Sequence, residues 1–258
     1  MRIYICLKQV PDTETRIKVA PSGSQLDETG VKWVINPYDE FAIEEAIKFK
    51  EANPQAQITA VTVGPKARVN SALLTAMAMG ADDSLLIDCS ETLDVLTTAK
   101  ALAAAIQKEG APHLIFTGKL SIDGSFSATG PMLAELLKIP HVSVVSSITY
   151  SDSGLTVKRE VEGGNAETYT VPTPALIAAN KGLNKPRFAS LPGIMKAKKK
   201  PMKEVSMADL GVSPTSSKVK LSNFELPKDR PTCKMIAGDP QQQAKELVRL
   251  LREEAKVL

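Results

Sequence analysis

The residues best suited to chemistry lie in one stretch, GKLSIDGSFSATGP, which spans residues 118–131. Gly124 and Gly130 allow close approach of the backbone to a ligand, and the stretch carries hydroxyl donors at Ser125, Ser127 and Thr129. A helix follows, so free amide groups and the helix dipole favour a phosphate here. The spacing matches neither the Walker A pattern nor GxGxxG, so a plain strand-to-helix turn remains the alternative.

Three further segments are expected to face the same ligand because each follows or ends an expected strand. They are Cys6, the helix start Asn36 to Asp39, and Val63 with Gly64. Asn36 is expected to act as an N-cap, and Pro37 suits the first helical position. Tyr38 or Phe126 could stack on a purine or could belong to the core.

No catalytic arrangement accompanies this loop. Asp123 is its only carboxylate, and neither a second acid nor a base beside a nucleophile can be assigned. His113 and His141 each follow a proline at an expected strand start and are interpreted as structural. The three cysteines are far apart with no CxxC, which argues against disulfides and a zinc site. The residues thus predict a nucleotide-binding and docking subunit, with no catalytic residues and no metal.

The composition further narrows the class of protein to which this chain can belong. The chain has 258 residues, 43% hydrophobic and 24% charged, with a net charge of +3. These values are ordinary for a globular protein and argue against nucleic acid as a partner. The start, MRIYICLKQV, resembles neither a signal peptide nor a presequence, and no segment is long enough to span a membrane. We expect a cytoplasmic protein without membrane insertion.

Apolar strand-like runs alternate with helical patterns up to Lys138, which is typical of a doubly wound parallel α/β sheet. The expected strands are Ile3–Leu7, Ile58–Val63, Leu85–Ile87 and His113–Thr117. The turn-rich residues 12–32 are expected to form a hairpin excursion. Ligands in such folds bind outside the carboxyl ends of the strands.

After Pro140 the pattern changes. Residues 142–149 and 155–161 flank SDSG and predict a hairpin, with Arg159 on its apolar side and in need of an anionic partner. Residues 206–210 predict a short helix, and residues 212–238 an irregular arm. Asp239 and Pro240 then begin an amphipathic helix. We divide the chain into an α/β domain, 1–211, and an arm with a helix, 212–258, that packs on a partner subunit.

The segment from Asn184 to Pro201, NKPRFASLPGIMKAKKKP, combines three prolines, exposed-looking apolar residues and a lysine run. Prolines exclude a long helix or a central strand. An apolar tip beside cationic residues suits a protruding loop that docks an acidic partner. A solvated basic loop is the alternative reading, and the absence of catalytic machinery favours docking.

Together these stretches resemble the beta subunit family of electron-transfer flavoproteins over nearly the whole chain. The most specific part is VKREVEGG, residues 157–164, followed by the segment just described. CLKQVPD, INPYDEFAIEEA and GKLSIDGSFSATGP support the resemblance.

The resemblance implies a heterodimer with a larger alpha subunit, which mainly holds one electron-carrying FAD, and a structural AMP bound by this chain. The implied AMP contacts are Cys6, Asn36, Pro37, Tyr38, Asp39, Val63, Gly118, Lys119, Leu120, Ser121, Ile122, Asp123, Gly124, Ser125, Phe126, Ser127, Ala128 and Thr129.

The resemblance also implies that the docking segment recognises electron donors, typically acyl-CoA dehydrogenases, with Leu191 as anchor. The implied recognition residues are Leu191, Pro192, Gly193, Ile194, Met195 and Lys196, with the lysines as steering charge. A membrane-bound quinone oxidoreductase is the typical acceptor. Arg159 and Glu160 are the implied inter-subunit residues, Glu160 pairing with an arginine of the mobile FAD domain. Thr13 stands where some relatives place an aromatic residue near the flavin, and that contact is not carried over.

Two alternatives remain. Ile122-Asp123-Gly124 is similar to bifurcating relatives, which bind a second FAD in place of AMP and oxidise NADH, whereas LPGIMKAKKK resembles the non-bifurcating group, which we favour. A stand-alone nucleotide-binding protein of similar architecture is the other alternative, and the long irregular arm argues against it.

Overall fold

A nine-stranded sheet organises the protein, for which a computed structural model describes residues 1–151, 154–230 and 232–258. Neighbouring strands are parallel from β11 to β7, and β8 and β9 continue the sheet antiparallel. The order across the sheet is β11 (Met202–Ser206), β5 (Asp83–Asp88), β4 (Gln57–Gly64), β1 (Arg2–Cys6), β6 (Leu114–Gly118), β10 (Ala175–Ala179), β7 (His141–Ser151), β8 (Gly154–Glu160) and β9 (Ala166–Val171).

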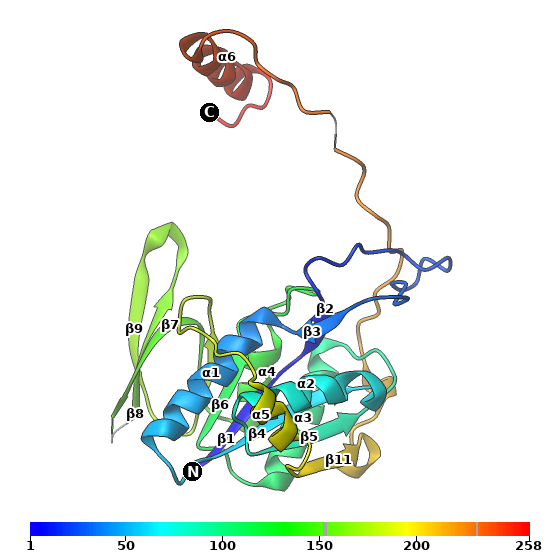
Figure 1. Ribbon diagram of the computed structural model, residues 1–258, viewed down its shortest axis with the longest axis vertical. Helices are drawn as coiled ribbons and strands as arrows, with labels where there is room; N and C mark the ends of the chain where they lie inside the picture. Colours follow the sequence, from blue (N-terminus) through cyan, green and yellow to red (C-terminus); the bar gives the residue numbers. More distant parts are fainter. Residues whose placement is uncertain (152–153, 231) are drawn as a thin grey trace.

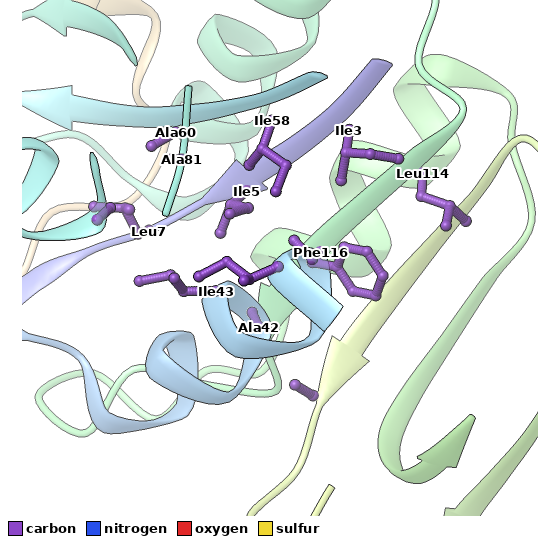
Figure 2. Packing of buried hydrophobic residues seen from close by; sticks show 14 of the residues in the cluster. Ile3, Ile5, Leu7, Ala42, Ile43, Ile58, Ala60, Ala81, Leu114 and Phe116 are labelled. Atoms are coloured by element: carbon purple, nitrogen blue, oxygen red, sulfur yellow. The ribbon is translucent and has the colours of Figure 1, made fainter. Parts of the chain in front are cut away.

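Helices cover both faces of this sheet (Figure 1). Residues of α1 (Pro37–Ala52) and α2 (Lys66–Met79) pack in one hydrophobic cluster, and those of α3 (Val95–Glu109) and α4 (Thr129–Leu137) in another. Figure 2 shows the first cluster, in which Ile43 of α1 meets Ile5 of β1 and Phe116 of β6. The predicted doubly wound α/β fold is confirmed.

The central strands are apolar because both of their faces are covered. In β1, Ile3 and Ile5 belong to one cluster and Tyr4 to the other, and all three have no exposed surface. A run without polar alternation is the pattern of such a doubly covered parallel strand. Because chain order moves from β1 to β4 on one side and to β6 on the other, the carboxyl ends of β1 and β6 flank the point where strand order reverses.

The hairpin excursion after β1 is confirmed. Strands β2 (Gln9–Pro11) and β3 (Trp33–Ile35) pair antiparallel as a separate two-stranded sheet. A single bridge between Val19 and Leu26 closes the tip of the excursion. The chain then enters α1 directly, so the excursion and the start of α1 lie at the same end of the sheet.

The hairpin of β7 and β8 is also confirmed, although Asp152 and Ser153 of its expected turn lie outside the described residues. A 3-10 turn, η1 (Glu162–Gly164), leads into β9, which the sequence analysis missed. All residues of β9 except Val171 are exposed, so β9 lacks the apolar alternation that would have revealed it.

The expected helix at residues 206–210 is wrong in its start. Residues 202–206 form the edge strand β11, and only Ala208–Leu210 are helical, as the 3-10 turn η2. The hydroxyl of Ser206 donates to Asp209 at 2.7 Å, so this serine is both the last strand residue and the turn former. Val205 is the buried residue of β11. The strand is too short to show an alternation of apolar and polar residues.

The arm leaves the domain after Gly211 and runs away from it (Figure 1). It includes the 3-10 turn η3 (Pro214–Ser216), and Lys218 N donates to Asp94 Oδ2 at 2.6 Å. Farther along, Phe224 N donates to the carbonyl of Gly23 in the excursion at 2.9 Å. The final helix, α6 (Pro240–Glu253), begins with a capping box at Asp239 and buries no residue. No helix in the described ranges has the length and apolar character needed to cross a membrane.

Candidate functional site

Asp39 is the polar centre of the region at the carboxyl ends of β1 and β6, which we call the crevice because ligands of doubly wound folds bind at this place. Its buried carboxylate accepts hydrogen bonds from Lys8 N at 2.7 Å, Gly118 N at 3.0 Å and Asn36 Nδ2 at 3.0 Å. Burial raises the pKa of Asp39 to about 7 although these three bonds act to lower it. One side chain of α1 therefore joins the ends of both central strands.

Asn36 extends this frame to the loop after β6. Its Nδ2 donates to the carbonyl of Leu120 at 2.8 Å, and its Oδ1 accepts from Ile122 N at 3.1 Å. The expected capping bond is absent: Asn36 stands at the N-cap of α1, but its side chain accepts no hydrogen bond from a backbone amide of the helix. The amide is occupied by the loop, and Pro37 begins the helix as predicted.

Gly118 is required by this close approach. A Cβ atom there would lie 2.4 Å from Asp39 Oδ1 and 2.8 Å from the backbone carbon of Tyr38. The next residue, Lys119, donates its amide to Ala179 O and places its ammonium 5.1 Å from the centre of the Tyr38 ring. The start of the loop thus lies directly against the start of α1.

Lys8 anchors the middle of the loop. Its ammonium lies 2.7 Å from Asp123 Oδ2 and 3.5 Å from Ser121 Oγ. The Lys8 partner holds the pKa of Asp123 below its usual value, against the effect of burial. Lys8 was not predicted from the sequence, although a cation immediately after a buried strand at a candidate phosphate site is a usable signal.

The end of the loop keeps hydroxyl and amide groups available to a ligand. Ser125 and Ser127 adopt φ values of 54° and 53°, in the left-handed region, and Phe126 between them is 58% exposed. Ala128 is the N-cap of α4 and offers no side-chain bond, so the amides of Thr129 and Gly130 have no side-chain cap, and Pro131 has no N–H.

Thr117 supplies a buried polar atom that lacks a partner. Its side chain is almost fully buried, and its Oγ1 has no hydrogen bond. A Cβ atom at Gly130 would lie 3.1 Å from this hydroxyl, so glycine keeps the start of α4 close to the end of β6. Such an orphan hydroxyl beside a helix start fits a site completed by a ligand. The sequence analysis missed Thr117 because it lies inside an apolar strand.

The remaining predicted contacts lie around the same crevice. Cys6 ends β1 and is buried, which raises the pKa of its thiol to about 12 and excludes a reactive thiolate. Val63 lies near the end of β4 and is partly buried against the α3 and α4 cluster. Phe126, at 58% exposed, does not belong to the core, so the alternative reading of this residue is wrong.

The docking segment is not an irregular loop throughout, because Leu191–Ala197 form the short helix α5. Ser190 caps it by accepting from Gly193 N at 3.1 Å, and Pro192 lies in its first turn, where proline is tolerated. A Cβ atom at Gly193 would lie 2.5 Å from the carbonyl of Ala78 in α2. This helix therefore packs closely against α2.

Acidic residues of α1 hold the entry to α5. Arg187 makes bonds of 2.8 Å to Glu44 Oε2 and 2.7 Å to Glu51 Oε1. Asn184 Nδ2 donates to Glu45 Oε2 at 2.9 Å. Because Glu44 and Glu45 are themselves buried, these bonds fix the segment on the domain.

The fixed segment presents apolar side chains to solvent. Leu191 is 79% exposed and Met195 is 72% exposed, and Ile194 lies beside them. Phe188, which the sequence analysis left out, is 97% exposed on the same segment. Lys196 is exposed as expected. We call Phe188, Leu191, Ile194 and Met195 the docking surface.

Lys200 corrects the description of the lysine run as steering charge. Its ammonium donates to the carbonyls of Met77 at 2.9 Å and Ala81 at 2.6 Å, at the end of α2. Burial lowers its pKa. Lys200 is therefore a structural cap of α2, whereas Lys198 and Lys199 remain exposed.

Arg159 shares the inward face of β8 with Leu155 and Val157, as predicted, and is half-buried. Its nearest acid is Glu167 Oε2, at 3.9 Å from Nε, and Nε itself makes no hydrogen bond. Glu160, at the end of β8, is exposed and accepts a hydrogen bond from Asn180 Nδ2 at 2.8 Å. Arg159 and Glu160 therefore both retain polar atoms that could bind a further group near the end of β10.

Comparison with known proteins identifies the family of this chain. The model of the electron transfer flavoprotein domain matches residues 24–210. The electron transfer flavoprotein subunit beta of Bacillus subtilis is 40% identical over the full length of both chains. The subunit beta of Mus musculus is 37% identical, over 100% of this chain and 99% of its own. The mitochondrial subunit beta of Arabidopsis thaliana is 38% identical over the full length of both.

A family match over most of the chain and full-length identities of this size assign the chain to the family of these relatives. Electron transport, flavoprotein association and the lack of an enzymatic activity of its own follow from it. The chain belongs to the electron transfer flavoprotein family, as a beta subunit.

Proposed function

We propose that this chain pairs with an alpha subunit and carries electrons from acyl-CoA dehydrogenases and similar flavin dehydrogenases to a membrane quinone oxidoreductase. The FAD is held mainly by the alpha subunit and supplies the electron-transfer chemistry when bound. This chain binds AMP, supports the flavin domain and docks the donor. The observation that carries the proposal is the preorganised crevice around Asp39, which lies on the same helix that fixes the docking surface.

The residues present fit an AMP phosphate. Thr117 has an orphan hydroxyl, the start of α4 offers amide groups, and Lys119 brings positive charge to the loop, whereas the charge of Lys8 is paired with Asp123. Phosphates bind at helix starts because free amides and the helix dipole point toward them. Asp39 and Asn36 hold the loop and bind no phosphate, since their polar atoms are already bonded to it.

The docking surface fits a small apolar pocket on a donor. Leu191 projects from the first turn of α5, whose backbone is fixed by Ser190 and Gly193. A fixed backbone lowers the entropic cost of binding, which favours one or two anchoring side chains. Lys198 and Lys199 add positive charge beside this surface and steer an acidic partner.

The arm and α6 are proposed to bind the alpha subunit. Leu247 and Val248 are 47% and 44% exposed on a helix that buries no residue in this chain. An amphipathic helix without a partner on its own domain gains stability by packing elsewhere. The proposed division at residue 211 follows the 3-10 turn η2, after the last sheet strand ends at Ser206. Glu160 is proposed to pair with an arginine of the flavin domain, through the carboxylate that Asn180 positions.

Identification of the bound nucleotide tests the proposal. The purified heterodimer is denatured with acid, and the released nucleotides are separated by chromatography. One AMP and one FAD per heterodimer are expected. Two FAD and no AMP would favour the bifurcating alternative, to which Ile122-Asp123-Gly124 is similar. A stable colourless monomer that needs no partner would overturn the electron-transfer proposal as a whole.

A further inference from the structure

A cavity of about 260 Å³ lies beside the hairpin of β2 and β3 and shares no residue with the crevice around Asp39. Its lining comes from the hairpin, from the start of α1 and from the middle of α2. The lining residues are Gln9, Trp33, Val34, Ile35, Glu40, Ser71, Ala72 and Thr75. Nothing in the proposed nucleotide binding or donor docking uses it.

Gln9 gives the cavity a buried acceptor without a partner. The side chain is 5% exposed, and its Oε1 makes no hydrogen bond. Its Nε2 donates to Ser71 Oγ at 2.8 Å, while Ser71 Oγ donates to Arg68 O at 3.2 Å. Because the serine proton is already used, Ser71 can only accept from Gln9, and this fixes the amide with its oxygen unpaired.

Thr75 and Glu40 supply further acceptors to the cavity. Thr75 Oγ1 donates its proton to Ser71 O at 2.9 Å, so only its lone pairs remain. Glu40 is an exposed residue whose carboxylate has no hydrogen bond or ion pair within the described part of the chain, and partial burial raises its pKa. A ligand for this cavity must therefore donate several hydrogen bonds. A positive charge on the ligand would be attracted by the Glu40 carboxylate.

We propose that the cavity receives an arginine side chain of the partner subunit, whose guanidinium donates to Glu40, Gln9 and Thr75. A guanidinium is planar, offers five donors and is weakly hydrated, which suits a half-enclosed site with several acceptors better than a compact ammonium. The inference rests on the heterodimer of the proposed function and adds a contact that is separate from its nucleotide site and docking surface.

The course of the arm supports a partner subunit as the source. The arm crosses the excursion that β2 and β3 carry, where Phe224 N donates to Gly23 O, before it continues to α6 (Figure 1). The exposed apolar face of α6 requires a partner. The arm that leads to α6 thus passes the excursion, and the base of the excursion lines the cavity. We therefore expect the subunit that α6 binds to lie close to the cavity.

Arg68 is the competing cation within the chain. Its guanidinium lies 4.1 Å from the centre of the Trp33 ring, and it approaches Glu28 at 3.9 Å. Its Nε is buried without a hydrogen bond. A swing of this side chain into the cavity would satisfy Glu40 without any partner, so the experiment has to separate the two cations.

The experiment measures the dissociation constant of the holo heterodimer by native mass spectrometry on dilution. Glu40→Gln is expected to raise it about tenfold, and Gln9→Leu by a smaller factor in the same direction. Glu14→Gln, an exposed acid of the same excursion, is the charge-matched control and should change it less than about twofold. Circular dichroism verifies that each variant is folded.

Agmatine, which carries a guanidinium, is the probe of the site. It is expected to weaken association of the unmodified heterodimer and to leave the Glu40→Gln heterodimer unaffected, with putrescine less effective than agmatine. Unchanged dissociation in both variants would overturn the proposal. So would agmatine binding that does not affect association, which would identify a small-molecule site.

Arg68→Met separates the internal cation. If Arg68 fills the cavity, this variant and Glu40→Gln will lower the thermal stability of the subunit equally and leave association unchanged, which overturns the proposal. The AMP and FAD released from each variant are measured in parallel. Their amounts report on the proposed function alone, so the cavity proposal can fail while the electron carrier stands.

Discussion

The crevice around Asp39 and the docking surface are built in opposite ways on the same helix. At the start of α1, Asp39 faces inward, and its bonds draw two strand ends together around a space lined by amides and hydroxyls. One turn or more further along, Glu44 and Glu45 hold a segment whose apolar side chains face outward. The crevice depends on the close approach of backbone segments from α1 and the two strand ends. The docking surface depends on exposed side chains.

This difference predicts different responses to substitution. A single added atom in the crevice meets backbone that cannot move, so stability and nucleotide binding are lost together. Truncation of a side chain on the docking surface removes no internal contact, so function is lost while the fold stays intact.

Gly118→Ala should have the largest effect. The new Cβ would lie 2.4 Å from Asp39 Oδ1 and 2.8 Å from the backbone of Tyr38, and neither can withdraw without breaking the frame. We expect the free energy of unfolding to fall by about 3 kcal/mol and bound nucleotide to be lost, measured by urea unfolding and nucleotide analysis. In Gly124→Ala the added atom meets only side chains, the exposed ring of Phe126 and the hydroxyl of Ser121, so this control should retain the free energy of unfolding.

Leu191→Ala should slow reduction of the flavin by a donor dehydrogenase about 30-fold, corresponding to about 2 kcal/mol for an anchoring side chain. The urea midpoint and the flavin content should not change, because the side chain is 79% exposed. Stopped-flow reduction measures the rate, and Leu221→Ala on the arm serves as an exposed-leucine control. Unchanged reduction kinetics would remove Leu191 from the docking role.

The fold was predictable because its signals are local. Apolar runs such as residues 3–7 are covered on both faces, and Pro37 and Asp239 mark helix starts that the structure retains. The edge strands β9 and β11 were missed, since an edge strand that buries one or two residues has no period to detect.

The candidate site was predictable as a set of segments and not as a set of atoms. Strand ends and the glycine-rich loop were identified, but Thr117 and Lys8 were not, because each gains its role from a neighbour far away in sequence. Asn36 was expected to cap the backbone amides of its own helix and instead bonds Leu120 and Ile122. Long-range partners of this kind depend on the crossover topology, which local propensity does not encode.

Lys200→Met should separate structural from steering lysines. The substitution removes two hydrogen bonds to the end of α2, from Lys200 to Met77 O and Ala81 O, while keeping the apolar stem. We expect the free energy of unfolding to fall by about 1–2 kcal/mol. The rate of donor docking at high salt should also fall, because the chain after α5 is no longer fixed to α2. If stability is unchanged, Lys200 belongs with the exposed lysines after all.

Lys199→Gln should have the smallest effect, and only at low ionic strength. The side chain is exposed and has no partner acid within the described residues, so its charge acts only on an approaching protein. We expect the association rate with a donor dehydrogenase to fall about two- to threefold at 10 mM salt. The difference should vanish near 300 mM salt, where screening removes the attraction, while unfolding is the same at both concentrations. A loss that persists at high salt would instead place Lys199 in direct contact with the donor, and would extend the docking surface beyond its apolar side chains.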